Sequence, residues 1–130
     1  LPICSIFGTL NHIVAGDRAW LERFEGKAAT IRDYDQPMAE DFAGLTRVRA
    51  AEDERIVALV EDIDADELDA THYYTSIAGA RAELPTRWAM AHMFNHQTHH
   101  RGQAHGLLSA TTVAPPPLDL AIYLLERAKG

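Results

Sequence analysis

Four of the chain's seven histidines fall in the run HMFNHQTHHRGQ, which extends from His92 to Gln103. An α-helix turns about 100° per residue, so side chains four positions apart lie one turn apart on the same face. His96 and His100 have this spacing, and so do His92 and His96. Neutral imidazole is the commonest side-chain ligand for transition metals, and two imidazoles placed in this way can bind one ion. The run therefore predicts a helix that carries a pair of metal ligands.

The apolar residues of the same helix rank the possible pairs. With His96 at 0°, His100 falls at roughly +40°, whereas His92 and His99 fall at roughly −40° and −60°. The apolar residues lie on the positive side, and they are Ala89, Met93, Ala104 and Leu107. We therefore expect His96 and His100 to form the buried pair, with His92 or His99 as a possible fourth nitrogen ligand. The alternatives are a pair of core histidines that are satisfied by hydrogen bonds, or an exposed polar face of the helix.

A third histidine lies in the first predicted helix, which extends from about residue 5 to residue 24. Large apolar side chains recur in it every three or four positions, at Ile6, Leu10, Ile13, Trp20 and Phe24. A separate stripe holds small residues, and His12 is the only large polar side chain on that stripe. Because small residues let a neighbouring helix approach closely, we expect His12 to point toward that helix and to join His96 and His100.

The rest of the chain predicts a single all-α domain over residues 1–130. The predicted segments are a loop over 25–38, a second long helix over 39–63, a helical turn over 64–68, a strand or extended connector over 71–76, the histidine helix from Pro85 to about Ser109, a proline-rich linker over 110–117 and a short amphipathic helix over 118–127. We expect the acidic side chains of the second helix to form a solvated face. Trp20, Trp88 and Tyr123 have the spacing of packing residues.

Length and charge restrict the possible function. The chain has 130 residues, of which 47% are hydrophobic, and this is enough for one domain with a real core. Its net charge is −7 and it has no basic run, so we expect it to bind neither nucleic acid nor a membrane. No apolar stretch approaches the roughly 20 residues that span a bilayer. The single cysteine, Cys4, cannot form an intrachain disulfide, which fits a cytoplasmic location.

The ligand types indicate the metal and its chemistry. Three neutral imidazoles leave an ion its full positive charge and at least one open position, and they suit zinc or nickel better than magnesium or calcium. Gln97 stands where a zincin helix, H-E-x-x-H, carries its general base, so we do not expect a peptidase of that type. Gln103, at roughly −20° from His96, is expected either to orient a ligand or to lie on the helix surface. For Asp17 we predict an ion pair with an arginine.

Several motifs together resemble the DinB family of damage-inducible proteins. They are LNH at residues 10–12, GDRAW at 16–20, NHQTHHRGQ at 95–103 and PPLD at 116–119, followed by an apolar helix with Tyr123. The resemblance covers both ends of the chain, and the middle fits by order and length.

The resemblance implies a four-helix bundle, often a homodimer, whose metal ligands are His12, His96 and His100. Family members normally have another helix before the one that carries His12, so we expect either that this first helix is missing here or that the bundle is completed differently. The resemblance also implies metal-dependent chemistry with a low-molecular-weight thiol such as bacillithiol, mycothiol or glutathione. We therefore expect a metal-dependent thiol S-transferase-like enzyme with a small-molecule substrate. The alternatives are a metal-dependent hydrolase and a non-enzymatic metal-binding stress protein.

Overall fold

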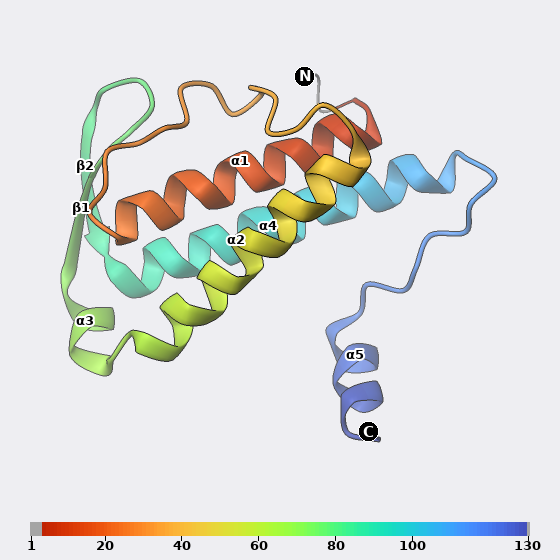
Figure 1. The fold of residues 1–130 in the computed structure, drawn as a ribbon. Helices are drawn as coiled ribbons and strands as arrows, with labels where there is room; N and C mark the ends of the chain where they lie inside the picture. The colour runs from red at the N-terminus through yellow and green to blue at the C-terminus, as the bar shows by residue number, and fades with distance from the viewer. Residues whose placement is uncertain (1–3, 130) are drawn as a thin grey trace.

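Three long helices form the body of the protein in the computed structural model, which describes residues 4–129 (Figure 1). They are α1 (Ile6–Phe24), α2 (Phe42–Asp62) and α4 (Thr86–Ser109). The most extensive contact joins α1 to α4, and α2 packs across α1. No helix in this part of the chain is long and apolar enough to cross a membrane.

Two of the three long helices, α1 and α2, begin where a side chain caps them. The Ser5 hydroxyl accepts a hydrogen bond from the Gly8 backbone N–H at 3.0 Å, which starts α1 as predicted. The Asp41 carboxylate accepts one from the Gly44 backbone N–H at 2.7 Å, so α2 starts at Phe42 rather than near residue 39. The helical segments predicted from apolar periodicity are therefore confirmed, with small shifts at their ends.

The protein is mostly helical, but the chain forms a β-hairpin between residues 71 and 85, so the all-α prediction is confirmed only in part; the strand or extended connector predicted over 71–76 is a strand. After the short helix α3 (Ala65–Asp69), strand β1 (Thr71–Thr75) pairs antiparallel with β2 (Arg81–Pro85), and Thr71 is opposite Pro85. Gly79 adopts a φ of +85° in the turn, a conformation that favours glycine. The first strand is rich in β-branched and aromatic residues, but the second, RAELP, has no such signal and depends on its pairing with β1.

The four-helix bundle is not found among the described residues, because the fourth long helix is absent there. The last helix, α5 (Leu120–Arg127), is short and stands away from the long helices at the end of an extended linker (Figure 1). Of the three aromatic residues expected to pack, Trp20 is buried, whereas Trp88 and Tyr123 are 62% and 53% exposed. The prediction is wrong for these two because α4 buries only one face and α5 buries none.

Two small apolar clusters hold the long helices and the loop between α1 and α2. The first joins the three helices near the hairpin and contains Trp20, Leu21, Ile56, Ala89 and Met93. The second lies beneath the loop and contains Ala15, Ala19 and Ile31. The stripe of large apolar residues on α1 is therefore covered by helices, and the stripe of small residues is covered partly by the loop.

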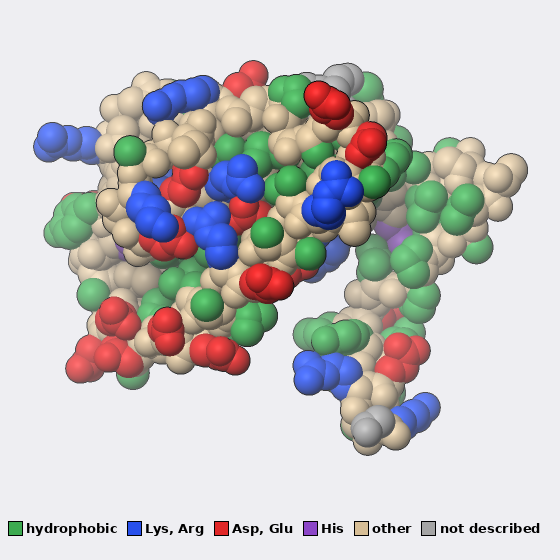
Figure 2. Space-filling model, in the orientation of Figure 1, with side chains coloured by type: hydrophobic (Ala, Val, Ile, Leu, Met, Phe, Trp, Pro, Cys, Tyr) green, Lys and Arg blue, Asp and Glu red, His purple; other side chains and the backbone are tan. Residues whose placement is uncertain are grey.

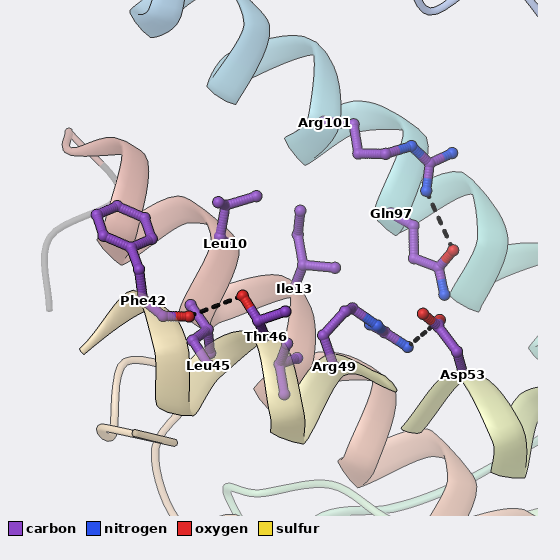
Figure 3. Close-up of a pocket in the computed structure, with 10 residues that line it drawn as sticks. Leu10, Ile13, Phe42, Leu45, Thr46, Arg49, Asp53, Gln97 and Arg101 are labelled. Carbon is purple, nitrogen blue, oxygen red and sulfur yellow. Dashed lines mark hydrogen bonds and ion pairs between the residues drawn. The ribbon is translucent and has the colours of Figure 1, made fainter. Parts of the chain in front are cut away.

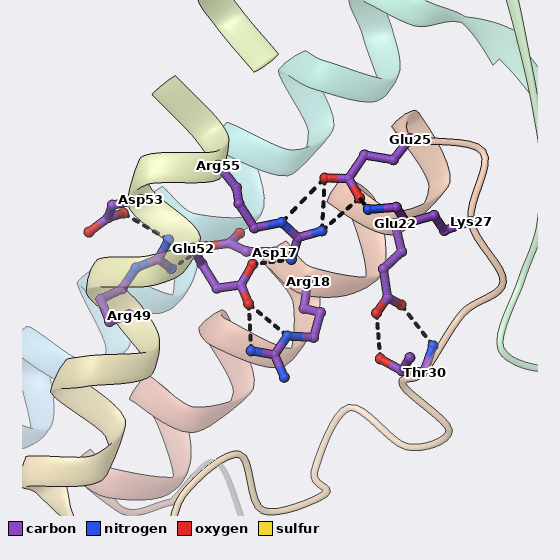
Figure 4. A network of polar contacts seen from close by, with 10 residues as sticks. All are labelled: Asp17, Arg18, Glu22, Glu25, Lys27, Thr30, Arg49, Glu52, Asp53 and Arg55. Carbon is purple, nitrogen blue, oxygen red and sulfur yellow. Dashed lines mark hydrogen bonds and ion pairs between the residues drawn. The ribbon is translucent and has the colours of Figure 1, made fainter. Parts of the chain in front are cut away.

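A network of ion pairs joins α1 to α2 (Figure 4). Asp17 is fully buried and pairs with Arg49, as predicted; burial raises the pKa of Asp17, and the hydrogen bond from Arg49 opposes this. Glu52 is 1% exposed and accepts hydrogen bonds from Arg18 and Arg55, each at 2.6 Å. The prediction of a solvated acidic face is therefore wrong at Glu52. Figure 2 shows the basic and acidic side chains side by side on this face of the molecule.

We expect Glu52→Gln to lower the free energy of unfolding by about 2 kcal/mol, because it leaves two arginines with one neutral acceptor between them. Urea denaturation followed by circular dichroism measures this. Glu54→Gln, at an exposed acidic position on the same helix, is the control and should change stability by less than about 0.5 kcal/mol. Equal losses in the two variants would show that the buried contacts contribute nothing beyond net charge.

Candidate metal centre

The contact between α1 and α4 brings three histidines together. His12 comes from α1, and His96 and His100 come from successive turns of α4. One ring nitrogen from each lies within 4.8 Å of the others. Nε2 of His12 is 3.3 Å from Nε2 of His96, and the ring centroid of His100 is 4.5 Å from that of His12. His100 is buried and the other two are partly buried, so the group lies at the edge of the core.

The outer nitrogens of two of these rings are held by acceptors. Nδ1 of His12 is 3.3 Å from an oxygen of Asp35, and Nδ1 of His100 is 2.7 Å from Oε1 of Gln103. Each acceptor favours a proton on Nδ1 and so leaves Nε2 with a free lone pair. This pattern, with one nitrogen turned inward and the other hydrogen-bonded to the protein, is typical of metal-ligating histidines.

The environment of His96 and His100 favours their neutral imidazoles. Burial, and after it the neighbouring His100 and His12, lowers the pKa of His96 to about 4. Burial also lowers the pKa of His100, against the hydrogen bond to Gln103. Only neutral imidazole can donate a lone pair to a metal, so little proton competition is expected at neutral pH. The donor set therefore fits a divalent transition metal.

A glycine makes the close approach of α4 possible. Gly16 lies one turn after His12 on α1, directly against the ring of His96. A Cβ atom at position 16 would lie 2.8 Å from Cε1 and 3.2 Å from Nδ1 of that ring. The ring could not keep its place beside a larger residue at this position.

The sequence is similar to known proteins. The model of the DinB family matches residues 2–128. The chain belongs to the DinB family. It is 25% identical over 129 residues to Protein DinB of Bacillus subtilis (strain 168), in an alignment that covers 92% of this chain and 72% of that protein. No solved structure shows a significant match.

In this member of the DinB family, the loop between α1 and α2 completes the site. Asn11 is fully buried; its side-chain NH₂ donates to the Gln36 carbonyl at 2.8 Å, and its oxygen accepts from the Met38 N–H at 2.7 Å. These two bonds hold the turn that places Asp35 against His12. Sequence reasoning missed Asp35, because it lies in a loop without periodicity. The sequence feature that could have pointed to this loop is Asn11 in the LNH motif, since its side chain bonds to the backbone of the loop.

The remaining histidines of the α4 run lie outside the group. His92 and His99 are exposed, and their rings contact Trp20 and His100 respectively. Across residues 4–129, the histidines whose ring nitrogens converge are His12, His96 and His100. Gln103 is exposed on the helix surface and its Oε1 also contacts Nδ1 of His100, so both alternatives for this residue hold.

We expect Asp35→Asn to weaken zinc binding roughly 10- to 100-fold, because the amide accepts a weaker hydrogen bond from His12 and can present its NH₂ group instead. Competition titration against a chromophoric chelator measures the affinity. Asp35→Glu should restore part of it. Glu40→Gln removes one exposed negative charge close to the loop and serves as the control. Equal weakening in Glu40→Gln would mean that only the net charge matters.

Proposed function

We propose that this protein is a metal-dependent enzyme in which His12, His96 and His100 hold one zinc or nickel ion. We further propose that it transfers a low-molecular-weight thiol to an electrophilic small molecule. The observation that supports the proposal most directly is the convergence of three ring nitrogens, because on two of the rings the other nitrogen is hydrogen-bonded, in His12 to Asp35 and in His100 to Gln103. Three protein ligands with an open position are typical of catalytic rather than structural zinc sites.

The residues around the site would each have a defined task. Asp35 and Gln103 hold protons on Nδ1 of His12 and His100, and so keep the inward nitrogens free to bind the ion. Gly16 leaves the space that the ring of His96 occupies. A bound divalent ion supplies the positive charge that lowers the pKa of a coordinated thiol. In the transfer, sulfur bonds to the electrophilic carbon, the leaving group departs with the electron pair, and the thiol proton passes to solvent.

The test is turnover with several thiols. Zinc-loaded and nickel-loaded protein is incubated with a chromogenic electrophile, 1-chloro-2,4-dinitrobenzene, and with bacillithiol, mycothiol, glutathione or cysteine in turn. Turnover with at least one thiol, lost in His96→Ala and kept in His99→Ala, would support the transferase. Metal-loaded protein that gives no rate above the uncatalysed reaction with any of the four thiols would count against it.

A metal-dependent hydrolase is the second candidate. Hydrolysis needs a base that can reach the attacking water, and the carboxylate of Asp35, with 43% side-chain exposure, lies on the outer side of the His12 ring, so it could act only through an intervening water. A panel of chromogenic esters and amides, run on the same metal-loaded protein, separates the two activities. Hydrolysis by the unmodified protein that is lost in Asp35→Asn at zinc concentrations that saturate both proteins, without turnover of any thiol, would favour the hydrolase.

A further inference from the structure

Arg23, in the last turn of α1, is a buried cation without a carboxylate partner. It is 8% exposed, and no ion pair joins it to an acidic side chain within residues 4–129. Its buried Nε has no hydrogen-bond acceptor in that part of the chain. Its Nη2 donates to the hydroxyl of Tyr34 at 3.2 Å, which is at the long limit for such a bond. Burying a charge is costly unless the charge is paired, so a guanidinium in this state is expected to have an anionic partner.

Other buried charges in the protein have partners of their own. Asp17 pairs with Arg49, and Arg49 also pairs with Asp53 at 2.8 Å (Figure 3). Glu22, the residue adjacent to the unpaired arginine, accepts hydrogen bonds from the backbone N–H and the hydroxyl of Thr30 (Figure 4). The nearest carboxylate along the chain is therefore already in use, and the partner of the buried arginine has to come from outside the chain.

The side chains around Arg23 orient its guanidinium and leave its donor edge unmatched. The guanidinium carbon lies 4.6 Å from the ring centroid of Trp20 and 4.9 Å from that of Tyr74. These cation–π contacts and the C-terminal end of α1 stabilise part of the positive charge. Neither of them accepts a hydrogen bond from Nε. The edge formed by Nε and Nη2 has the geometry that binds a carboxylate through two parallel hydrogen bonds.

Tyr34 connects Arg23 to the metal centre. Its hydroxyl accepts the hydrogen bond from Arg23, and its ring meets that of His12 edge-on, with the centroids 5.9 Å apart. Arg23 follows His12 by about three turns of α1 at an angular offset of roughly 20°, so both residues lie on the same side of the helix. Between them this side carries the small residues Gly16 and Ala19. One tyrosine side chain therefore spans the distance between the metal centre and the unpaired cation.

We propose that Arg23 determines the substrate specificity of the metal site by binding a carboxylate on the substrate while the reacting group lies at the ion. This inference rests on the proposed function. The carboxylate accepts hydrogen bonds from Nε and Nη2, and on Nη2 it replaces the hydroxyl of Tyr34, whose loop side chain moves aside. The substrate class is then an acid whose carboxylate lies about the length of a tyrosine side chain from the reacting atom. Either the thiol or the electrophile carries that carboxylate.

Two matched pairs of probes test the carboxylate and distinguish its sources. Glutathione is compared with its diethyl ester, and 4-chloro-3-nitrobenzoate with its methyl ester, by isothermal titration calorimetry on the zinc-loaded protein. We expect the acid of at least one pair to bind roughly 10- to 100-fold more tightly than its ester, as for charge-assisted hydrogen bonds. A preference in the first pair assigns the carboxylate to the thiol, and a preference in the second assigns it to the electrophile. Equal binding of acid and ester in both pairs, or no binding of any probe, would overturn the inference.

Arg23→Met tests the residue, because it removes the charge and keeps an apolar stem against Trp20 and Tyr74. The preference for the acid should disappear in this variant. It should persist in Arg32→Gln, which removes one exposed positive charge from the loop that carries Tyr34. Because Arg23 is unpaired, the midpoint of urea denaturation of Arg23→Met should stay the same or rise. A lower midpoint with the acid preference retained would show that Arg23 only packs against the two rings.

Zinc content and thiol turnover, measured on the same samples, keep this inference apart from the proposed function. Arg23 is not among the converging ligands, so Arg23→Met should hold as much zinc as the unmodified protein. A protein that turns over a thiol without preferring the acid in either pair would overturn the role of Arg23 and leave the transferase standing. A preference for the acid without turnover would count against the transferase alone.

Discussion

Replacing His100 by alanine is expected to abolish metal retention during purification, whereas the unmodified protein, prepared without a histidine tag or added metal, should hold about one zinc or nickel ion per chain. Zinc sites in small proteins bind with roughly 10 kcal/mol or more, so one ligand of three accounts for about 3–4 kcal/mol. That corresponds to a loss of roughly 100- to 1,000-fold in affinity. Elemental analysis and competition titration together measure both quantities.

The control for this variant is the neighbouring histidine. His99 is exposed, lies on the same helix and stands outside the converging group, so His99→Ala should keep the metal. Circular dichroism must show that His100→Ala still folds, since His100 is 7% exposed and its removal leaves a cavity. An unmodified protein that binds no added zinc at neutral pH would contradict the site, and so would equal losses in the two variants.

The second large effect is expected from a single methyl group. Alanine is normally about 1 kcal/mol more favourable than glycine inside a helix, so on helix propensity alone Gly16→Ala should stabilise α1. The added Cβ would lie 2.8 Å from the ring of His96, so the ring must turn away or α4 must move. Either change displaces one of the three nitrogens. We expect zinc affinity to fall at least about 100-fold, as for a displaced ligand, while the protein stays folded.

Gly102→Ala provides the comparison for Gly16→Ala. Gly102 is in α4, and a Cβ at that position meets nothing within 4 Å. This variant should gain up to about 1 kcal/mol in the free energy of unfolding and keep its metal. Urea denaturation and zinc titration on both variants separate helix stability from site geometry. Unchanged zinc binding in Gly16→Ala would show that the His96 ring is not needed where the structure places it.

The sequence allowed the long helices and the three histidines to be predicted because both depend on spacing along one helix. The 3.6-residue period placed His96 and His100 on one face, and the small-residue stripe placed His12 toward α4. The features it did not predict depend on partners far apart in the chain. Strand β2 forms because it pairs with β1, Glu52 is buried because Arg18 and Arg55 meet it, and Asp35 reaches His12 because Asn11 holds the loop. None of these contacts has a local pattern.

The separation between His12 and His96 has a consequence for folding. The two residues are 84 positions apart, so an ion bound to both would close a long loop that contains the hairpin and all of α2. Such a closure restricts the unfolded chain much as a disulfide does, by up to about 4 kcal/mol for a loop of this length, less any affinity of the ion for unfolded histidines. During synthesis α1 leaves the ribosome long before α4, so His12 is available before His96 and His100, and the site cannot form until α4 has been made. Metal capture would then be among the last events in the maturation of the protein, and would lock in a fold that is already formed.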